Sequence, residues 1–160
     1  MRRRRWPAAP PPTTEGLPVT GAAVLVSRRD VNLRVTEIVA YPTGMEVRLD
    51  LTVRGRSAHR ARHETRPLDD PDDPSARWSY LAVSVRVDDL EGEADPRHPP
   101  APSKAARSDA SVYHTQPLYW IGAYPRSGSI TITAGWTQIG LKPMTTTIRV
   151  GPNPSVPAER

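Results

Sequence analysis

The clearest pattern in the chain is the strict alternation over Met45–Val53, where every odd position is apolar and every even position is polar. Because successive side chains of a β-strand point to opposite faces, this stretch has one apolar face and one polar face. Residues 81–87 and 130–136 repeat the alternation. The pattern predicts an antiparallel sheet with one face buried and the other in water.

Strand-like segments recur along the chain and are separated by Pro and Gly. Besides Met45–Val53, we expect strands at Gly21–Val26, Val31–Tyr41, Trp78–Val87, Tyr113–Ile121, Ser129–Trp136 and Leu141–Val150. The alternation breaks within Val31–Tyr41, which predicts a bulge or burial on both faces. The sequence Tyr41-Pro42-Thr43-Gly44 predicts a turn in which Pro presets φ and Gly supplies a positive φ. Val31–Tyr41 and Met45–Val53 should therefore form a hairpin.

These segments predict an all-β fold. About seven short strands with turn signals are typical of an antiparallel immunoglobulin-like or jelly-roll sandwich, with a closed barrel as the alternative. No segment has the apolar stripe of a helix packed on a core. Since Phe is absent, Trp and Tyr must supply the large core side chains. The late aromatic cluster Tyr113, Tyr119, Trp120, Tyr124 and Trp136 is therefore expected to be buried, the alternative being an exposed binding platform.

Composition divides the chain into three parts. Residues 1–16 are rich in Arg and Pro and predict a flexible, disordered arm, residues 17–151 form the sandwich, and residues 152–160 form a flexible tail. Two internal stretches, Arg54–Arg77 and Asp88–Val112, are nearly free of large apolar residues and are expected to be long loops.

Two basic clusters are candidate binding sites in a chain of net charge +5. Arg2, Arg3, Arg4 and Arg5 would neutralise phosphates, and the adjacent Trp6 would stack on a base, so this segment is a candidate nucleic-acid contact. The first loop is a candidate interaction loop through five arginines, namely Arg54, Arg56, Arg60, Arg62 and Arg66. The alternative for this loop is a solvated segment whose arginines pair with the acidic run Asp69–Asp73.

Signals for catalysis are weak. The chain has no Cys, which excludes disulfides, thiolate metal sites and a Cys nucleophile. His59 and His63 lie four positions apart, but the Glu of the zinc hydrolase motif is missing and no helix is predicted there. We therefore expect no metal, no cofactor, no catalytic residue and no enzyme. The alternative is a hydrolase or metal enzyme assembled from His59, His63, His114 and loop carboxylates.

No stretch approaches the ~20 apolar residues of a membrane span, so we expect a soluble protein with no membrane partner. The absence of Cys favours an intracellular setting, and we expect a cytoplasmic protein.

Several motifs together resemble a group of uncharacterised actinobacterial β-sandwich proteins over residues 30–145. The segment Tyr41-Pro42-Thr43-Gly44 runs into an alternating strand, and Leu118-Tyr119-Trp120 leads through Pro125-Arg126-Ser127-Gly128 to Trp136 and Gly140-Leu141. The acidic loop differs from the Gly-rich loop of that group. The resemblance implies a fold and a source, and no activity.

The functional expectation is a non-enzymatic interaction or structural module that binds a protein partner or a second copy of itself through a sheet edge, a loop or the arm. The alternative is an accessory non-specific nucleic-acid binder that uses Arg2–Trp6.

Overall fold

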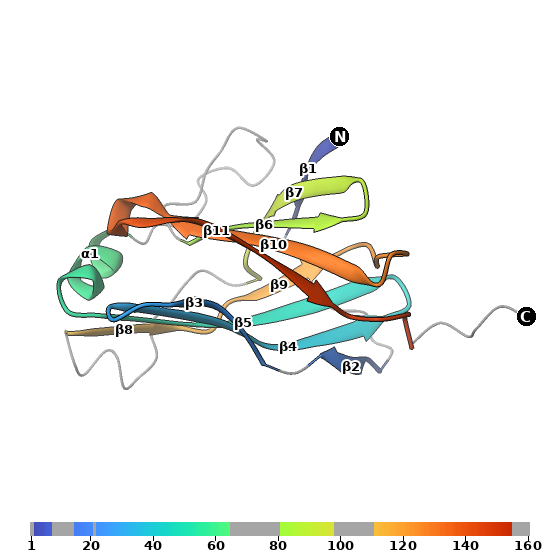
Figure 1. The fold of residues 1–160 in the computed structure, drawn as a ribbon, viewed down its shortest axis with the longest axis horizontal. Helices are drawn as coiled ribbons and strands as arrows, with labels where there is room; N and C mark the ends of the chain where they lie inside the picture. The colour runs from blue at the N-terminus through green and yellow to red at the C-terminus, as the bar shows by residue number, and fades with distance from the viewer. Residues whose placement is uncertain (1, 8–14, 21, 65–80, 98–110, 155–160) are drawn as a thin grey trace, which may run out of the picture.

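The computed structural model describes residues 2–7, 15–20, 22–64, 81–97 and 111–154, and these residues form two β-sheets packed face to face (Figure 1). The predicted all-β sandwich architecture is confirmed. Because both sheets are open, the closed-barrel alternative is wrong.

Sheet A holds five strands in the order β1-β7-β6-β10-β11. Their bounds are β1 Arg2–Trp6, β6 Ala82–Val87, β7 Leu90–Ala94, β10 Ser129–Trp136 and β11 Leu141–Arg149.

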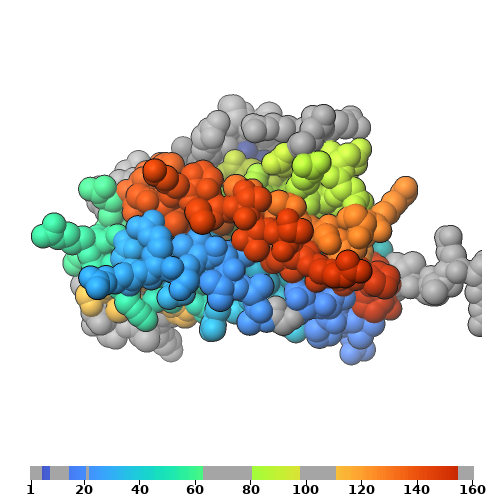
Figure 2. Space-filling model, in the orientation of Figure 1, coloured from blue at the N-terminus to red at the C-terminus, as the bar shows by residue number. Residues whose placement is uncertain are grey.

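Sheet B holds six strands, with β2, β4, β5 and β8 in that order, β3 paired with β4, and β9 paired with β5. Their bounds are β2 Leu17–Thr20, β3 Ala23–Ser27, β4 Val31–Tyr41, β5 Gly44–Arg54, β8 Val112–Thr115 and β9 Leu118–Ile121. On one face of the molecule β11 of sheet A runs beside β3 of sheet B (Figure 2).

The alternation places the core where it was predicted. The odd-numbered residues of β5 from Met45 to Val53 are all at most 1% exposed, whereas Arg48, Asp50 and Thr52 on the opposite face are half-buried. Val83, Val85 and Val87 of β6 are also buried, as are Ile130, Ile132 and Ala134 of β10. The two apolar faces therefore meet between the sheets.

The predicted hairpin is confirmed as β4–β5, with a register from Tyr41 opposite Gly44 to Val31 opposite Val53. The predicted bulge is present, since the register shifts between Val35 and Glu37. The predicted positive φ of Gly44 is wrong. The described glycines with a positive φ are Gly55, Gly128, Gly140 and Gly151, and Gly44 is not among them.

The sequence predicted no helix packed on the core, and this prediction is wrong. Arg56–Glu64 forms the helix α1 at one end of the sandwich (Figure 1). Ala58 and Ala61 are fully buried, so the helix packs through two small side chains that give no strong apolar periodicity in the sequence. One further turn, the 3₁₀ helix η1 Thr137–Ile139, connects β10 to β11. No helix in the described part of the chain is long and apolar enough to cross a membrane.

Three strands lie where none was expected, and the expected strand Tyr113–Ile121 forms two, β8 and β9. The described residues therefore contain eleven strands where the sequence suggested about seven. The arm predicted over residues 1–16 contains β1 and is not disordered over Arg2–Trp6. The second predicted loop contains β7, and β2 precedes the first expected strand. These strands are short and polar or Pro-containing, and they are ordered by pairing with a neighbour rather than by an apolar pattern of their own.

The expected burial of the aromatic cluster is confirmed for Tyr113, Tyr119 and Trp136, while Trp120 and Tyr124 are half-buried. At the C-terminal end, the Asn153 amide donates to the Tyr41 carbonyl oxygen at 3.0 Å, so ordered contacts extend past residue 151. The rest of the predicted tail, from residue 155, lies outside the described residues.

Candidate interaction site

The N-terminal strand β1 is the unusual element of sheet A. It pairs with β7 in parallel, from Arg2 opposite Leu90 to Trp6 opposite Ala94, whereas the other pairings between described strands are antiparallel. Parallel neighbours cannot be joined by a tight turn. The two strands come from opposite halves of the chain, and β1 forms one edge of the sheet.

Trp6 anchors this strand in the core. Its side chain is 1% exposed, and its indole Nε1 donates to the backbone carbonyl oxygen of Val85 at 2.9 Å. Since β7 separates β1 from β6, the indole must cross β7 to reach Val85. Gly92 is the β7 residue that pairs with Val85, and it has no side chain to obstruct the ring. The small inward residues of β7, Gly92 and Ala94, thus leave room for one large aromatic group.

Arg5 and Asp95 fix the end of the same strand. Arg5 Nε lies 2.9 and 2.8 Å from the two carboxylate oxygens of Asp95, whose side chain is almost fully buried. The Asp95 backbone N–H also donates to the Trp6 carbonyl oxygen at 2.9 Å. A charge-assisted bond and a backbone bond therefore meet at one residue.

The segment Asp95–Arg97 then crosses from sheet A to sheet B. Pro96 pairs with Tyr119 of β9, and the Arg97 N–H donates to the Leu118 carbonyl oxygen at 2.8 Å. Asp95, which binds Arg5 of β1, therefore lies two positions before Arg97, which is bonded to sheet B.

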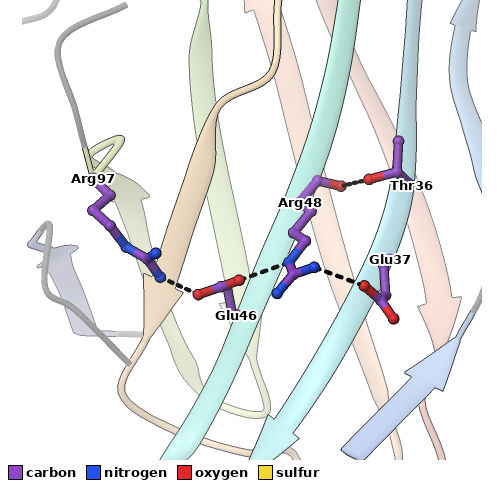
Figure 3. Close-up of polar contacts among 5 residues, drawn as sticks. All are labelled: Thr36, Glu37, Glu46, Arg48 and Arg97. Atoms are coloured by element: carbon purple, nitrogen blue, oxygen red, sulfur yellow. Dashed lines mark hydrogen bonds and ion pairs between the residues drawn. The ribbon is translucent and has the colours of Figure 1, made fainter. Parts of the chain in front are cut away.

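The guanidinium of Arg97 begins a row of four alternating charges across the outer face of sheet B (Figure 3). Arg97 donates to one carboxylate oxygen of Glu46, and Arg48 Nε donates to the other at 2.7 Å. Arg48 also donates to Glu37 at 3.0 Å. We call these residues, Arg97, Glu46, Arg48 and Glu37, the charged row.

Glu46 is the buried member of the charged row, at 1% exposure. A buried carboxylate is tolerated when it is paired and hydrogen-bonded on both oxygens, as Glu46 is. The hydrogen bond to Glu46 raises the pKa of Arg48, against the opposing effect of its partial burial. The bulge residue Thr36 donates its hydroxyl to the Arg48 carbonyl oxygen at 3.2 Å, so the bulge helps to position this arginine (Figure 3).

A shallow hollow of about 550 Å³ lies beside the charged row. It is lined by β2 and by the bulge region, through Pro18, Val19, Thr20, Thr36, Glu37 and Arg48. Because the charges of the row alternate and are paired with one another, the row itself stabilises the fold and offers little net charge to a ligand.

A second polar group lies on the same face of sheet B. Asp50 accepts hydrogen bonds from His114 Nε2 at 3.0 Å and from Gln116 at 3.2 Å. Burial opposes ionisation of Asp50, but these bonds, with the charges of His114 and Arg34, outweigh it and lower its pKa. His114 is thus engaged with Asp50, and His59 is exposed on α1. Within the described residues, no group of three or more His, Cys, Asp or Glu side chains could hold a metal ion.

The predicted nucleic-acid contact is corrected at two of its five residues. Trp6 is in the core and Arg5 is bonded to Asp95, so in this arrangement neither is presented to a base or a phosphate. The reason is that a core without Phe depends on Trp and Tyr for its large side chains, and Trp6 is one of them. Arg2, Arg3 and Arg4 are placed only as strand residues, and their contact with nucleic acid stays a prediction.

The described arginines of the predicted interaction loop lie on two elements, and their role in binding stays a prediction. Arg54 ends β5, whereas Arg56, Arg60 and Arg62 lie on α1. Arg60 donates to the Gln138 carbonyl oxygen at 3.4 Å and Arg62 to that of Val112 at 2.5 Å, so these two arginines hold the helix against its neighbours. Arg66 lies outside the described residues, as does the acidic run Asp69–Asp73.

Sequence reasoning missed Asp95, Arg97 and Glu46. Glu46 occupies a polar position of an alternating strand, where exposure is the ordinary expectation, and the partners that bury it come from a segment 51 positions away. The available signal was Trp6 itself, a lone large aromatic residue in a segment otherwise read as solvated.

No family model matches the chain, and comparisons with curated proteins and with solved structures found no match. The resemblance to the actinobacterial group is therefore neither supported nor contradicted by them.

Proposed function

We propose that this chain is a non-enzymatic protein-interaction module that binds a short extended strand along the edge of β7. The observation that carries the proposal is the docking of β1, a five-residue strand that pairs in parallel with β7 and inserts Trp6 into the core. Strand addition to an exposed sheet edge is a common mode of peptide recognition, in which backbone bonds give affinity and side-chain pockets give specificity.

The residues around β1 define what the site accepts. The β7 backbone supplies the hydrogen-bonding edge, the space over Gly92 and Ala94 accepts a large aromatic side chain, and the Val85 carbonyl oxygen accepts its N–H. The Asp95 carboxylate binds a cation on the preceding residue. The preferred ligand is therefore an extended peptide in which Arg precedes Trp, and the chain's own residues 2–6 occupy the site in this structure.

The narrower expectations belong to the same proposal. The sandwich is of immunoglobulin-like or jelly-roll type, the partner is a protein rather than a membrane, the protein acts in the cytoplasm, and the chain resembles a group of actinobacterial β-sandwich proteins.

A peptide-rescue experiment tests the site. The full-length W6A variant keeps the site but lacks its own aromatic anchor, so a synthetic peptide of residues 1–7 should raise its Tm in a concentration-dependent way, because binding to the folded state alone stabilises that state. Matched peptides carrying W6A or R5D should give little or no increase.

The wild-type chain provides the second measurement. Its own strand competes at a high effective concentration, so the labelled peptide should bind it more weakly than it binds W6A. If the native peptide neither raises the Tm of W6A nor binds the wild-type chain at millimolar concentration, the proposed function is wrong.

A further inference from the structure

We propose that the partner is a second copy of this chain, and that the two copies exchange β1 so that each N-terminal strand docks on β7 of the other copy. This inference rests on the proposed function, since it uses the same site and names the chain that supplies the strand.

The contacts of β1 do not depend on which copy supplies it. The Trp6–Val85 bond joins residues 79 positions apart, and the Arg5–Asp95 bond joins residues 90 positions apart. The paired strand, β7, begins at Leu90. A strand held by segments so distant in sequence makes the same contacts whether it comes from its own chain or from an identical one.

The length of the connecting segment permits exchange. Residues 7–16 join β1 to β2 and include Pro7, Pro10, Pro11 and Pro12. A chain of ten residues can span at most about 33–36 Å. That length is comparable to the width of a small domain, so the segment is long enough to carry β1 to a neighbouring molecule.

The symmetry of the exchange makes a closed dimer its natural product. If copy one supplies its strand to copy two, its own site is left for the strand of copy two, and both sites are filled by the native contacts. The exchanged dimer needs no contacts beyond those that β1 already makes, including the Arg5–Asp95 and Trp6–Val85 contacts.

A charge exchange between Arg5 and Asp95 gives a decisive experiment. The R5D chain carries Asp at both positions and the D95R chain carries Arg at both, so each alone has like charges at the site, whichever copy supplies the strand. Mixed in equal amounts, the two chains pair opposite charges at both sites only when they exchange strands with each other. We expect native mass spectrometry to show a heterodimer in the mixture, at least tenfold enriched over either homodimer.

The double variant R5D/D95R is the matched control. It pairs opposite charges both within one copy and between copies, so its Tm and its oligomeric state should match those of the wild-type chain. If this control behaves as wild type while the mixture yields no heterodimer, β1 docks only within its own copy and the exchange is refuted. The peptide rescue of W6A would still succeed in that case, so the failure of the exchange is distinguishable from failure of the proposed function.

A cysteine experiment decides the matter if the charge variants do not fold. The chain contains no Cys, so R5C and D95C each introduce a single thiol. Mild oxidation of the R5C and D95C mixture should give a covalent dimer whose disulfide joins positions 5 and 95, as identified by peptide mass spectrometry. The R5C/D95C double variant should then also give a dimer held by two such bonds. A double variant that oxidises only to a cross-linked monomer, together with no 5–95 linkage in the mixture, would overturn the proposal.

Discussion

The indole Nε1 of Trp6 donates to the Val85 carbonyl oxygen at 2.9 Å, and this bond ties the first strand of the chain to the middle of sheet A. Its acceptor and the space that the ring occupies exist only once β6 and β7 have paired. The N-terminal strand is therefore held by both strands of the β6–β7 hairpin, through backbone pairing with β7 and a side-chain bond to β6.

Truncation of Trp6 should be among the most destabilising single changes in the chain. W6A removes a fully buried indole and leaves a cavity, so the free energy of unfolding should fall by about 3–5 kcal/mol. W6F keeps an aromatic ring but loses part of the ring volume and the N–H to Val85, which predicts a smaller loss of about 1–3 kcal/mol. Urea denaturation followed by circular dichroism measures both. Equal stability of W6A and the wild-type chain would mean that β1 is not docked in solution.

Alternating side chains locate a strand from its own sequence. Ser129–Trp136 was expected and forms β10 with the same bounds, because each apolar residue faces the core. The segment Leu90–Ala94 was read as loop, yet it forms β7, since its Gly and Ala leave space that Trp6 fills from elsewhere in the chain. A strand whose burial depends on a distant residue has no local signature.

The candidate site could not be predicted from the sequence for the same physical reason, since its residues come from distant parts of the chain. A run of four arginines before Trp6 indicates a charged arm when read alone. Only the parallel pairing with β7 shows that Arg5 and Trp6 belong to the folded domain. The polar partner Asp95 stands in a stretch with few large apolar residues, where a loop was the ordinary expectation.

Removing the charge of Glu46 should destabilise the fold far more than removing that of Glu37. E46Q leaves the guanidinium of Arg97 without its anion at a buried position, so we expect a loss of about 3 kcal/mol. E37Q affects a pair whose side chains are 33% and 41% exposed, which predicts less than about 1 kcal/mol. Urea denaturation at neutral pH measures both variants. Similar small effects for the two would show that the charged row does not hold the crossing segment in place.

Asp88 should contribute to the loss of stability in acid. Its carboxylate accepts the backbone N–H groups of Arg126 at 2.9 Å and Ser127 at 3.2 Å. The bond from Arg126 is the largest cause that lowers the pKa of Asp88 below its usual 3.8, and burial opposes it only in part. A carboxyl whose pKa is lower in the folded state stabilises that state above the unfolded pKa, and the contribution is lost as the pH falls through the folded pKa.

The D88N variant isolates this charge. Asp88 has a φ of 54°, a conformation that Asn adopts with little strain, and the Asn side-chain oxygen can still accept one N–H. We expect D88N to lose about 1 kcal/mol at pH 7 and to show a shallower decrease in stability below about pH 4. A residual slope should remain, because the pKa values of Asp30 and Asp50 are also lowered. Urea midpoints measured from pH 2.5 to 7 test this, and superimposable profiles for variant and wild type would contradict it.

Gly44 is required by the close approach of two backbones rather than by a positive φ. A Cβ at Gly44 would lie 2.2 Å from the Ile121 carbonyl oxygen, at the point where β9 pairs with β5. Backbone atoms on both sides limit relief of this clash, so G44A should cost about 1–3 kcal/mol or more. Gly122 provides the control, because a Cβ there would meet only the Trp120 side chain at 3.7 Å. We expect G122A to change stability by no more than about 0.5 kcal/mol.

The variant G44N separates the two explanations for this glycine. Asn tolerates the left-handed conformation better than Ala does, so a turn that needed a positive φ would accept Asn with a smaller loss. A clash at Cβ affects Asn and Ala alike, and the longer Asn side chain adds further crowding. Urea denaturation should therefore show G44N to be at least as unstable as G44A. A clear advantage of G44N over G44A would instead support the positive-φ explanation, and would mean that the β4–β5 turn is not held against Ile121 in solution.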